Sequence, residues 1–316
     1  MRLVTFRTVE GGEAVGALLG EQQVLDLTRA SGGAAEFRSM IDLIAAGDKA
    51  LDAARRLVHA RLAPAILDLA TVRLLAPIPR PPRMRAFSLD PRHLAQAKVG
   101  FQKLLAPEGS YLQAGRDYPL PAAEPGYFAT PVYWFMDHYC VSGPDDHVKW
   151  PAYSDWVDYE LEIAAVIGNH GRDIGKAAAG NYIFGYTILN DLSARDAQLT
   201  ATATGLSITA KGKDFAGSYA LGPCIVTKDE VKHGDMHAIL RVNGEEWARG
   251  TPAGRHWTFE DGIAYASQAA ELVPGEIFSS ATVANCCGLE VARKGMRGDC
   301  VELEVEEIGV LRTWID

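Results

Sequence analysis

The chain has 316 residues, of which 48% are hydrophobic and 22% charged, and its formal net charge is −9. This length favours two domains, or one large domain with an appendage, and it can bury a core without disulfides or a structural metal. An acidic chain without a basic block lacks the positive surface that nucleic-acid binding requires.

Targeting and membrane signals are missing from the sequence. The first residues lack the apolar stretch of a secretory signal, and no run reaches the roughly 18–20 apolar residues of a membrane span. The five cysteines show no CxxC spacing, so neither a zinc ribbon nor a disulfide framework is indicated. We therefore expect a cytoplasmic globular protein with no nucleic-acid partner and no membrane partner.

The first quarter of the chain predicts a small α/β unit. Three short β-prone runs come first: 4–7, 14–18 and 24–27. Two stretches with helical periodicity follow: 37–46 and 50–61. A proline cluster then interrupts the pattern: Pro77, Pro79, Pro81 and Pro82. Because proline continues neither a helix nor a central strand, we expect a domain over 1–78 and a second over 79–316.

Beyond the prolines, short β-prone runs are separated by Gly, Pro and Asp. These runs are 132–135, 159–167, 182–189, 224–227, 239–242 and 301–305. Asn243-Gly244 predicts a two-residue hairpin turn, 259–272 predicts a helix, and 115–126 predicts a long loop. Strands without regularly alternating helices favour an α+β, β-rich sandwich or barrel-like body over a doubly wound sheet.

The common nucleotide-binding and hydrolase motifs are absent, which leaves carboxylates and a few histidines as candidates for chemistry. In the run from Asp158 to Ile163, the strand period of two places Glu160 and Glu162 on one face, with Cα atoms roughly 6.5–7 Å apart. Two carboxylates at this spacing can converge on a hard cation such as Mg²⁺ or Ca²⁺.

The alternative for this strand is an ordinary solvated face, which we expect for the same alternation at 301–306. What distinguishes Glu160 and Glu162 is the apolar run that follows at 163–167, which carries the strand into the core. A carboxylate at the entrance to such a strand needs a partner, and a cation is the strongest one.

Two further segments offer polar groups. A buried strand ends at Asn190-Asp191, so Asp191 is either a third oxygen ligand or, like Ser193, a cap of the turn that follows. Lys213 lies in a glycine-flanked loop, where it either supplies a fixed positive charge for an oxyanion or is an ordinary surface lysine.

These segments together resemble the fumarylacetoacetate hydrolase family. The resemblance runs from about Arg85 to the C-terminus and is carried by DYELEIAAVIG, GYTILNDLSARDAQ and KGKDFAGSYALGPCIVT, in that order. It implies a mixed β-sandwich or roll as the catalytic domain, preceded by a small N-terminal α/β domain, and a homodimer. It also implies a bound Mg²⁺, Ca²⁺ or Mn²⁺ ion, held by Glu160, Glu162 and Asp191. Substrate contact or loop ordering is implied for Arg195, Gln198 and Lys213.

Hydrolytic members of that family also use a His–Glu pair to activate water. Aligning 86–93 places His93 at the water-activating position, and aligning 288–295 makes Glu290 its partner. The same alignment exposes a departure, because Ala86 stands where the family has a fourth ligand, an aspartate. Ser88 stands where the family has a substrate-contacting tyrosine, so Ser88 is expected at a substrate-binding position. A site with one carboxylate fewer is expected to hold its ion more weakly.

The resemblance implies metal-dependent hydrolysis of a C–C bond in a β-diketone or acylpyruvate-type acid, through a metal-bound enolate. Glu290 would orient His93 as general base, and Lys213 with Gln198 would stabilise the oxyanion. The alternatives are decarboxylation, isomerisation or hydration of a 2-oxo acid on the same fold, and a catalytically altered protein. The segment 94–130 is expected to be a lid or a substrate-shaping loop.

Overall fold

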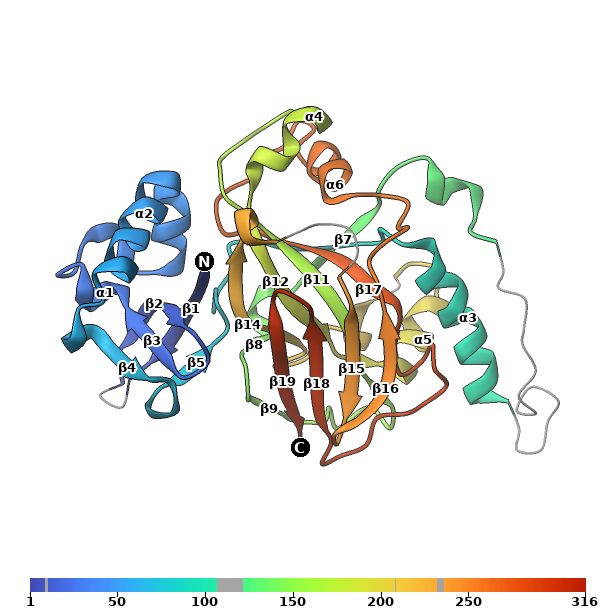
Figure 1. The fold of residues 1–316 in the computed structure, drawn as a ribbon. Coiled ribbons are helices and arrows are strands. Elements are labelled where there is room, and N and C mark those ends of the chain that lie inside the picture. The colour runs from blue at the N-terminus through green and yellow to red at the C-terminus, as the bar shows by residue number, and fades with distance from the viewer. Residues whose placement is uncertain (9–10, 107–121, 208, 232–235) are drawn as a thin grey trace.

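The computed structural model describes residues 1–8, 11–106, 122–207, 209–231 and 236–316. It shows a strand-rich α+β protein in which a small N-terminal unit lies beside a larger body (Figure 1). This confirms the fold class predicted from the sequence. Among the described residues, no helix combines the length and the apolar character that crossing a bilayer requires.

The N-terminal unit contains the predicted three strands and helical region. Its elements are β1 (Arg2–Arg7), β2 (Glu13–Leu19), β3 (Gln23–Asp26), α1 (Leu27–Ala30), α2 (Met40–Ala60), β4 (Ile66–Asp68) and β5 (Arg73–Leu75). The two predicted helices form the single element α2, which is interrupted at Gly47, where φ is 60°. A positive φ costs glycine little, so this residue permits the kink between the two halves.

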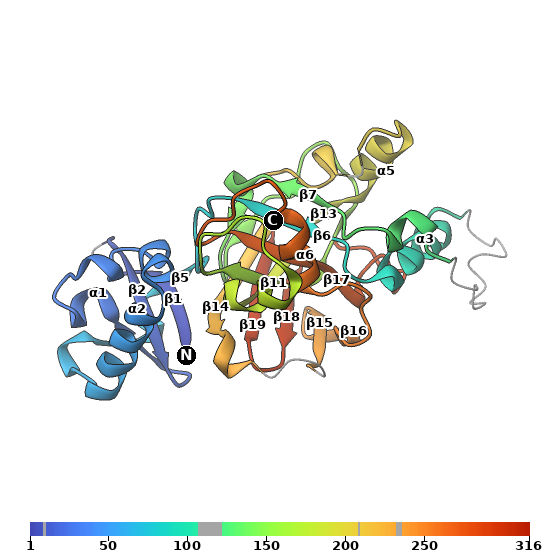
Figure 2. The same ribbon diagram turned by 90° about the horizontal axis from the view of Figure 1, so that it is seen from above.

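The body is built mainly from strands. Its elements are β6 (Met84–Phe87), α3 (Pro91–Leu105), β7 (Tyr133–Met136), β8 (Val141–Ser142), β9 (His147–Val148), β10 (Val157–Asp158), β11 (Glu160–Ile167), α4 (Lys176–Ala179), β12 (Ile183–Asp191), β13 (Ser193–Ala194), α5 (Arg195–Ala203), β14 (Tyr219–Thr227), β15 (Ala238–Val242), β16 (Glu245–Gly250), α6 (Phe259–Ala266), β17 (Ile277–Cys287), β18 (Cys300–Val305) and β19 (Gly309–Ile315). Seen from above, α3 and α5 lie on the side of the body away from the N-terminal unit (Figure 2).

One large sheet joins the two parts of the chain. Its strand order is β4-β3-β2-β1-β14-β12-β11-β17-β6-β7, and β1 pairs antiparallel with β14. The sheet of the N-terminal unit therefore continues into the body through backbone hydrogen bonds. We propose that the N-terminal unit ends at residue 78, within the proline-rich segment. The boundary then separates two folding units that share this sheet.

The alternation of side chains along β11 determines which of them pack between the two sheets. Leu161 and Ile163 pack in a cluster with Leu240 and Leu303 from the second sheet, whose order is β16-β15-β18-β19-β9. Ala164 belongs to a separate cluster on the opposite face. Because side chains alternate along a strand, Glu160 and Glu162 share the face of Ala164 and point away from the second sheet.

Local predictions had mixed outcomes. The hairpin turn at Asn243-Gly244 is confirmed, with φ of 53° and 79°. The predicted helix 259–272 ends at Ala266, and beyond it Ala269 has a φ of 51° while Leu272 exchanges backbone hydrogen bonds with Gly171. The predicted loop 94–130 is wrong over its first part, which is helix α3. Residues 107–121 of this segment, which include most of 115–126, lie outside the described residues, whereas 122–130 are described and contain a single 3-10 turn at Pro125–Phe128.

Candidate functional site

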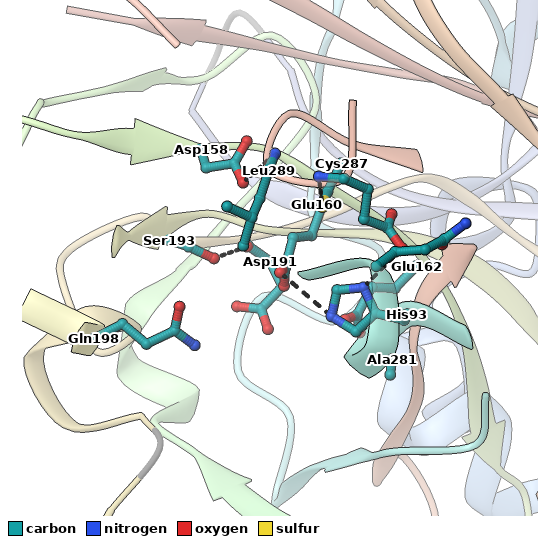
Figure 3. A network of polar contacts seen from close by, with 12 residues as sticks. His93, Asp158, Glu160, Glu162, Asp191, Ser193, Gln198, Ala281, Cys287 and Leu289 are labelled. Carbon is teal, nitrogen blue, oxygen red and sulfur yellow. Dashed lines mark hydrogen bonds and ion pairs between the residues drawn. The ribbon is translucent and has the colours of Figure 1, made fainter. Parts of the chain in front are cut away.

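Antiparallel pairing of β11 with β12 brings three carboxylates together at one end of the large sheet. The register places Leu161 opposite Asn190 and Glu162 opposite Leu189, so that the start of β11 adjoins the end of β12. Carboxylate oxygens of Glu160, Glu162 and Asp191 lie within 4.8 Å of one another. All three side chains are buried. We call these three residues the carboxylate cluster (Figure 3).

Two buried cations contact this cluster. The Lys213 ammonium donates to Glu160 and to Ser193 Oγ, and its Nζ lies 2.8 Å from Asp191 Oδ2. Arg195 Nη2 lies 2.6 Å from Glu160 Oε1. Lys213 is only 2% exposed, so the alternative of a surface lysine is wrong.

Protonation equilibria differ sharply among the three acids. Burial alone would raise the pKa of Glu160, but Arg195 and Lys213 hold it well below its usual range. Burial and the neighbouring Asp191 and Glu160 charges raise the pKa of Glu162 well above its usual range. Burial raises the pKa of Asp191 to about 6, despite the opposing charge of Lys213. Glu162 and Asp191 therefore have too little positive charge nearby to offset the cost of burying their ionised carboxylates.

The donor set fits a hard divalent ion. In the described part of the chain, four buried carboxylates, those of the cluster and Asp158, lie against Arg195 and Lys213, with His93 3.8 Å from Glu160, so these carboxylates in their ionised form outnumber the neighbouring cations. Asp191 Oδ1 is buried and has no hydrogen-bond donor within the described part of the chain. Oxygen donors and this charge deficit match the requirements of Mg²⁺, Ca²⁺ or Mn²⁺.

The strand β18 has the same alternation of glutamates as β11 and serves as a comparison for the carboxylate cluster. In β18, Glu302 and Glu304 are half-buried, and Glu304 pairs with Arg241 near the surface at 2.6 Å. No convergence of carboxylates occurs there among the described residues. The solvated face expected for this strand is what the structure contains.

A histidine faces the cluster from helix α3. Asp90 caps this helix by accepting from the backbone N–H of Arg92, and Pro91 occupies the first turn, where proline is favoured. His93 Nε2 lies 3.8 Å from Glu160 Oε1 (Figure 3). Its Nδ1 lies 3.2 Å from Glu290 Oε1. The alignment thus paired two residues that the fold does bring together.

The environment of His93 favours its charged form. Burial lowers the pKa of His93, but the charge and hydrogen bond of Glu290 and the charge of Glu160 outweigh burial and raise it. An imidazole held in this way is oriented by one carboxylate while its other nitrogen faces the cluster. This is the arrangement expected of a general base with an orienting partner.

A cavity of about 360 Å³ opens onto these groups. Ser88, Gln198 and Lys213 line it, as the predicted substrate contacts require, and Arg195 donates to Gln198 Oε1 at 2.8 Å. The rest of the wall is mainly apolar and includes Leu94, Phe101, Trp134, Leu199 and Leu289. Its size and its mainly apolar wall with a few polar groups are those of a small-molecule site.

Ala86 lies close to the cluster, as the alignment implied. It is fully buried in β6, where it pairs with Ser279 of β17, and the Ser279 hydroxyl donates to Glu162. No oxygen ligand comes from position 86 itself. Asp90 does not replace it, because its carboxylate is engaged with the Arg92 side chain and the helix end.

Ala86→Asp is therefore expected to tighten Mg²⁺ binding by ~10-fold, because it adds a charged oxygen ligand beside Glu162. Isothermal titration calorimetry on the two proteins measures the difference. Ala86→Asn, which adds similar volume without the charge, is the control and should gain much less. Equal affinity of the aspartate variant and the parent would place residue 86 out of reach of the ion.

Sequence reasoning gave no role to two residues of the site. Asp158 accepts from Arg195 and from the backbone N–H of Leu289, so it fixes the arginine and the segment before Glu290. The strand alternation that joined Glu160 to Glu162 extends back to Asp158 and was a usable signal. Ser279 contacts Glu162 from a distant segment, and no local pattern marks it.

The chain is similar in sequence to a known enzyme family. The family model described as fumarylacetoacetate (FAA) hydrolase C-terminal matches residues 109–316. The mitochondrial oxaloacetate tautomerase FAHD2A of Homo sapiens is 30% identical over 281 residues, which cover 87% of this chain and 78% of the relative.

Solved structures share the fold over the whole chain. A fumarylacetoacetate hydrolase from Exiguobacterium antarcticum has a TM-score of 0.74 at 24% identity, covering 100% of this chain and 99% of its own. Maleylpyruvate hydrolase from Sphingobium sp. SYK-6, in complex with manganese(II) and pyruvate, has a TM-score of 0.71 at 22% identity, covering 100% and 98%.

Proposed function

Because this chain belongs to the fumarylacetoacetate hydrolase family, we propose that it is a divalent-metal-dependent hydrolase of a C–C bond in a β-diketone or acylpyruvate-type acid. The observation that carries the proposal is His93, held by Glu290 at 3.2 Å and facing the carboxylate cluster. The family resemblance further supports a cytoplasmic homodimer.

The ion would be held by Glu160, Glu162 and Asp191, with Mg²⁺ as the first choice and Ca²⁺ or Mn²⁺ as alternatives. When bound, it supplies Lewis-acid polarisation and a template for the oxygens of the substrate. The manganese and pyruvate in the related maleylpyruvate hydrolase support both a divalent ion and a 2-oxo acid here.

The residues of the chain provide the proton transfers. Glu290 faces Nδ1 of His93, which keeps the proton on that nitrogen and leaves Nε2 free to take one from water. The hydroxide formed adds to a carbonyl carbon, and Lys213 with Gln198 stabilises the negative oxygen. The C–C bond then breaks to give a carboxylic acid and an enolate, and the proton on His93 returns to the enolate.

A second candidate is tautomerisation of a 2-oxo acid. The human oxaloacetate tautomerase at 30% identity favours it, and the loss of the family's aspartate and tyrosine at Ala86 and Ser88 is consistent with altered chemistry. In this reaction His93 would move a proton between carbon and oxygen of the same molecule, and no water would be consumed.

One pair of assays separates these reactions. The Mg²⁺-loaded protein is incubated with acetylpyruvate, where hydrolysis yields equimolar pyruvate and acetate, and with oxaloacetate, where tautomerisation changes the enol absorbance without a new product. Pyruvate and acetate formation that EDTA stops supports the hydrolase. Acceleration of the oxaloacetate reaction alone supports the tautomerase, and turnover of neither would contradict both proposals.

Metal binding is expected to weaken as the pH falls from 7.5 to 5.5. In the ion-free protein the pKa of Asp191 is raised to about 6, and that of Glu162 is raised by burial and by Asp191. Protons therefore compete with the ion for two of the three carboxylates, and binding releases protons. Calorimetry in buffers of different ionisation enthalpy measures both effects, and an affinity that is constant over this range would contradict the assignment.

A further inference from the structure

His93 also belongs to a second group of side chains of the types that bind metal ions. A nitrogen of His93, the sulfur of Cys287 and a carboxylate oxygen of Glu290 lie within 4.8 Å of one another. Cys287 is the last residue of β17 and is completely buried, and its Sγ accepts from the backbone N–H of Glu290 at 3.4 Å. The thiol is thus fixed beside the pair to which we assign proton transfer.

Glu290 itself is incompletely satisfied. Its side chain is 1% exposed, and Oε2 has no hydrogen-bond donor in the part of the chain that the structure describes. A buried carboxylate oxygen without a donor is costly unless a cation or another partner meets it. The Glu290 carboxylate belongs to the same group as the Cys287 sulfur and the imidazole.

The donor chemistry differs from that of the carboxylate cluster. Three oxygens suit a hard cation, whereas a thiolate, an imidazole and a carboxylate suit Zn²⁺ and similar softer ions. Ligand atoms on a tetrahedral Zn²⁺ are roughly 3.5 Å apart, given the usual zinc–ligand distances. Small side-chain movements within the observed 4.8 Å would therefore complete three ligands and leave the fourth position to water.

We propose that His93, Cys287 and Glu290 form a separate site for Zn²⁺ that inhibits the enzyme. Binding converts the thiol to a thiolate and releases its proton to solvent, and the ligating nitrogen of His93 gives up its own proton to the other ring nitrogen or to solvent. The ion then occupies a lone pair of His93 and neutralises Glu290, so that the base and its orienting group are both lost. The inhibition rests on the proposed role of His93, whereas the metal site does not.

Cobalt provides a direct test, because a Co²⁺–thiolate bond absorbs in the near ultraviolet. Co²⁺ added to the Mg²⁺-saturated protein should produce this band, which Cys287→Ser abolishes. Cys286→Ser is the matched control and should keep the band. Cys286 precedes Cys287 in β17 but packs in the cluster of Leu161 and Ile163, where its Sγ donates to Ala238 O, whereas Cys287 packs with Trp156 and Leu289. A band that survives in Cys287→Ser, or is absent from the parent, would overturn the site.

Zinc titrations then test the consequence for catalysis. Zn²⁺ should inhibit the Mg²⁺-loaded parent, and excess Mg²⁺ should not restore the rate. For Cys287→Ser, the Zn²⁺ concentration that halves the rate, relative to the zinc-free rate of the same variant, should be at least ten times higher than for the parent. Equal sensitivity of Cys287→Ser and Cys286→Ser, or relief by Mg²⁺, would overturn the proposal.

A further variant keeps the site testable if Cys287→Ser does not fold. Glu290→Gln removes the charged oxygen, so the cobalt band should weaken or require more Co²⁺, and an unchanged titration contradicts the site. A cobalt band without turnover of acetylpyruvate or oxaloacetate would leave this site standing while the proposed function fails.

Discussion

Glu162→Gln is expected to weaken Mg²⁺ binding by roughly 100-fold or more and to abolish the metal-dependent activity. The amide keeps the volume of the side chain but removes one of three charged oxygen ligands. Calorimetry measures the affinity, and turnover at saturating Mg²⁺ measures the activity.

The matched control is Glu304→Gln on β18, where the same alternation produces a solvated face with Arg241 nearby. This variant should bind Mg²⁺ and turn over substrate within about twofold of the parent, because a partly exposed ion pair contributes only ~0–1 kcal/mol. Equal losses in the two variants, or none in Glu162→Gln, would show that the carboxylate cluster is not the metal site.

Thermal unfolding distinguishes lost binding from lost folding. In the ion-free protein, burial and the charges of Asp191 and Glu160 raise the pKa of Glu162. Because the folded-state pKa is raised, the associated stability is present at low pH and is lost as the pH rises through it. Ion-free Glu162→Gln should therefore unfold at an equal or higher temperature than the ion-free parent at pH 8, and a marked decrease would point to general destabilisation.

His93→Ala is expected to lower kcat by about 10²–10⁴-fold, the range for loss of a positioned general base. Its Mg²⁺ affinity should stay within a few-fold of the parent, because His93 is outside the carboxylate cluster. Steady-state kinetics and calorimetry on the same preparations test the two statements. Turnover at the parental rate would remove His93 from the mechanism.

The control for this assignment is Glu290→Gln, read from the pH profile of kcat/KM. The charge and hydrogen bond of Glu290 raise the pKa of His93, and a base must be unprotonated to act. Removing that charge lowers the pKa, so the acidic limb of the profile should move to lower pH while the maximal rate falls. A limb that stays in place would mean that another group titrates there.

Local sequence patterns were sufficient for much of the architecture. Alternation along β11 placed Glu160 and Glu162 on one face, and Asn243-Gly244 defined a hairpin turn, because strand geometry and left-handed turn conformations depend on adjacent residues. Helix α3 was detectable too, since Asp90 and Pro91 are a typical helix start, but the proline-rich segment beyond it favoured a loop.

The sequence by itself determined which acids share a strand face, and the family motifs indicated Asp191, His93 and Glu290 as their companions. Only the tertiary structure decided what each group contacts. The Lys213 loop was equally compatible with a surface position, and Ser279 reaches Glu162 across 117 residues of chain. Burial, charge balance and the position of Cys287 arise from segments far apart in the sequence, and these long-range contacts set the pKa values of the site.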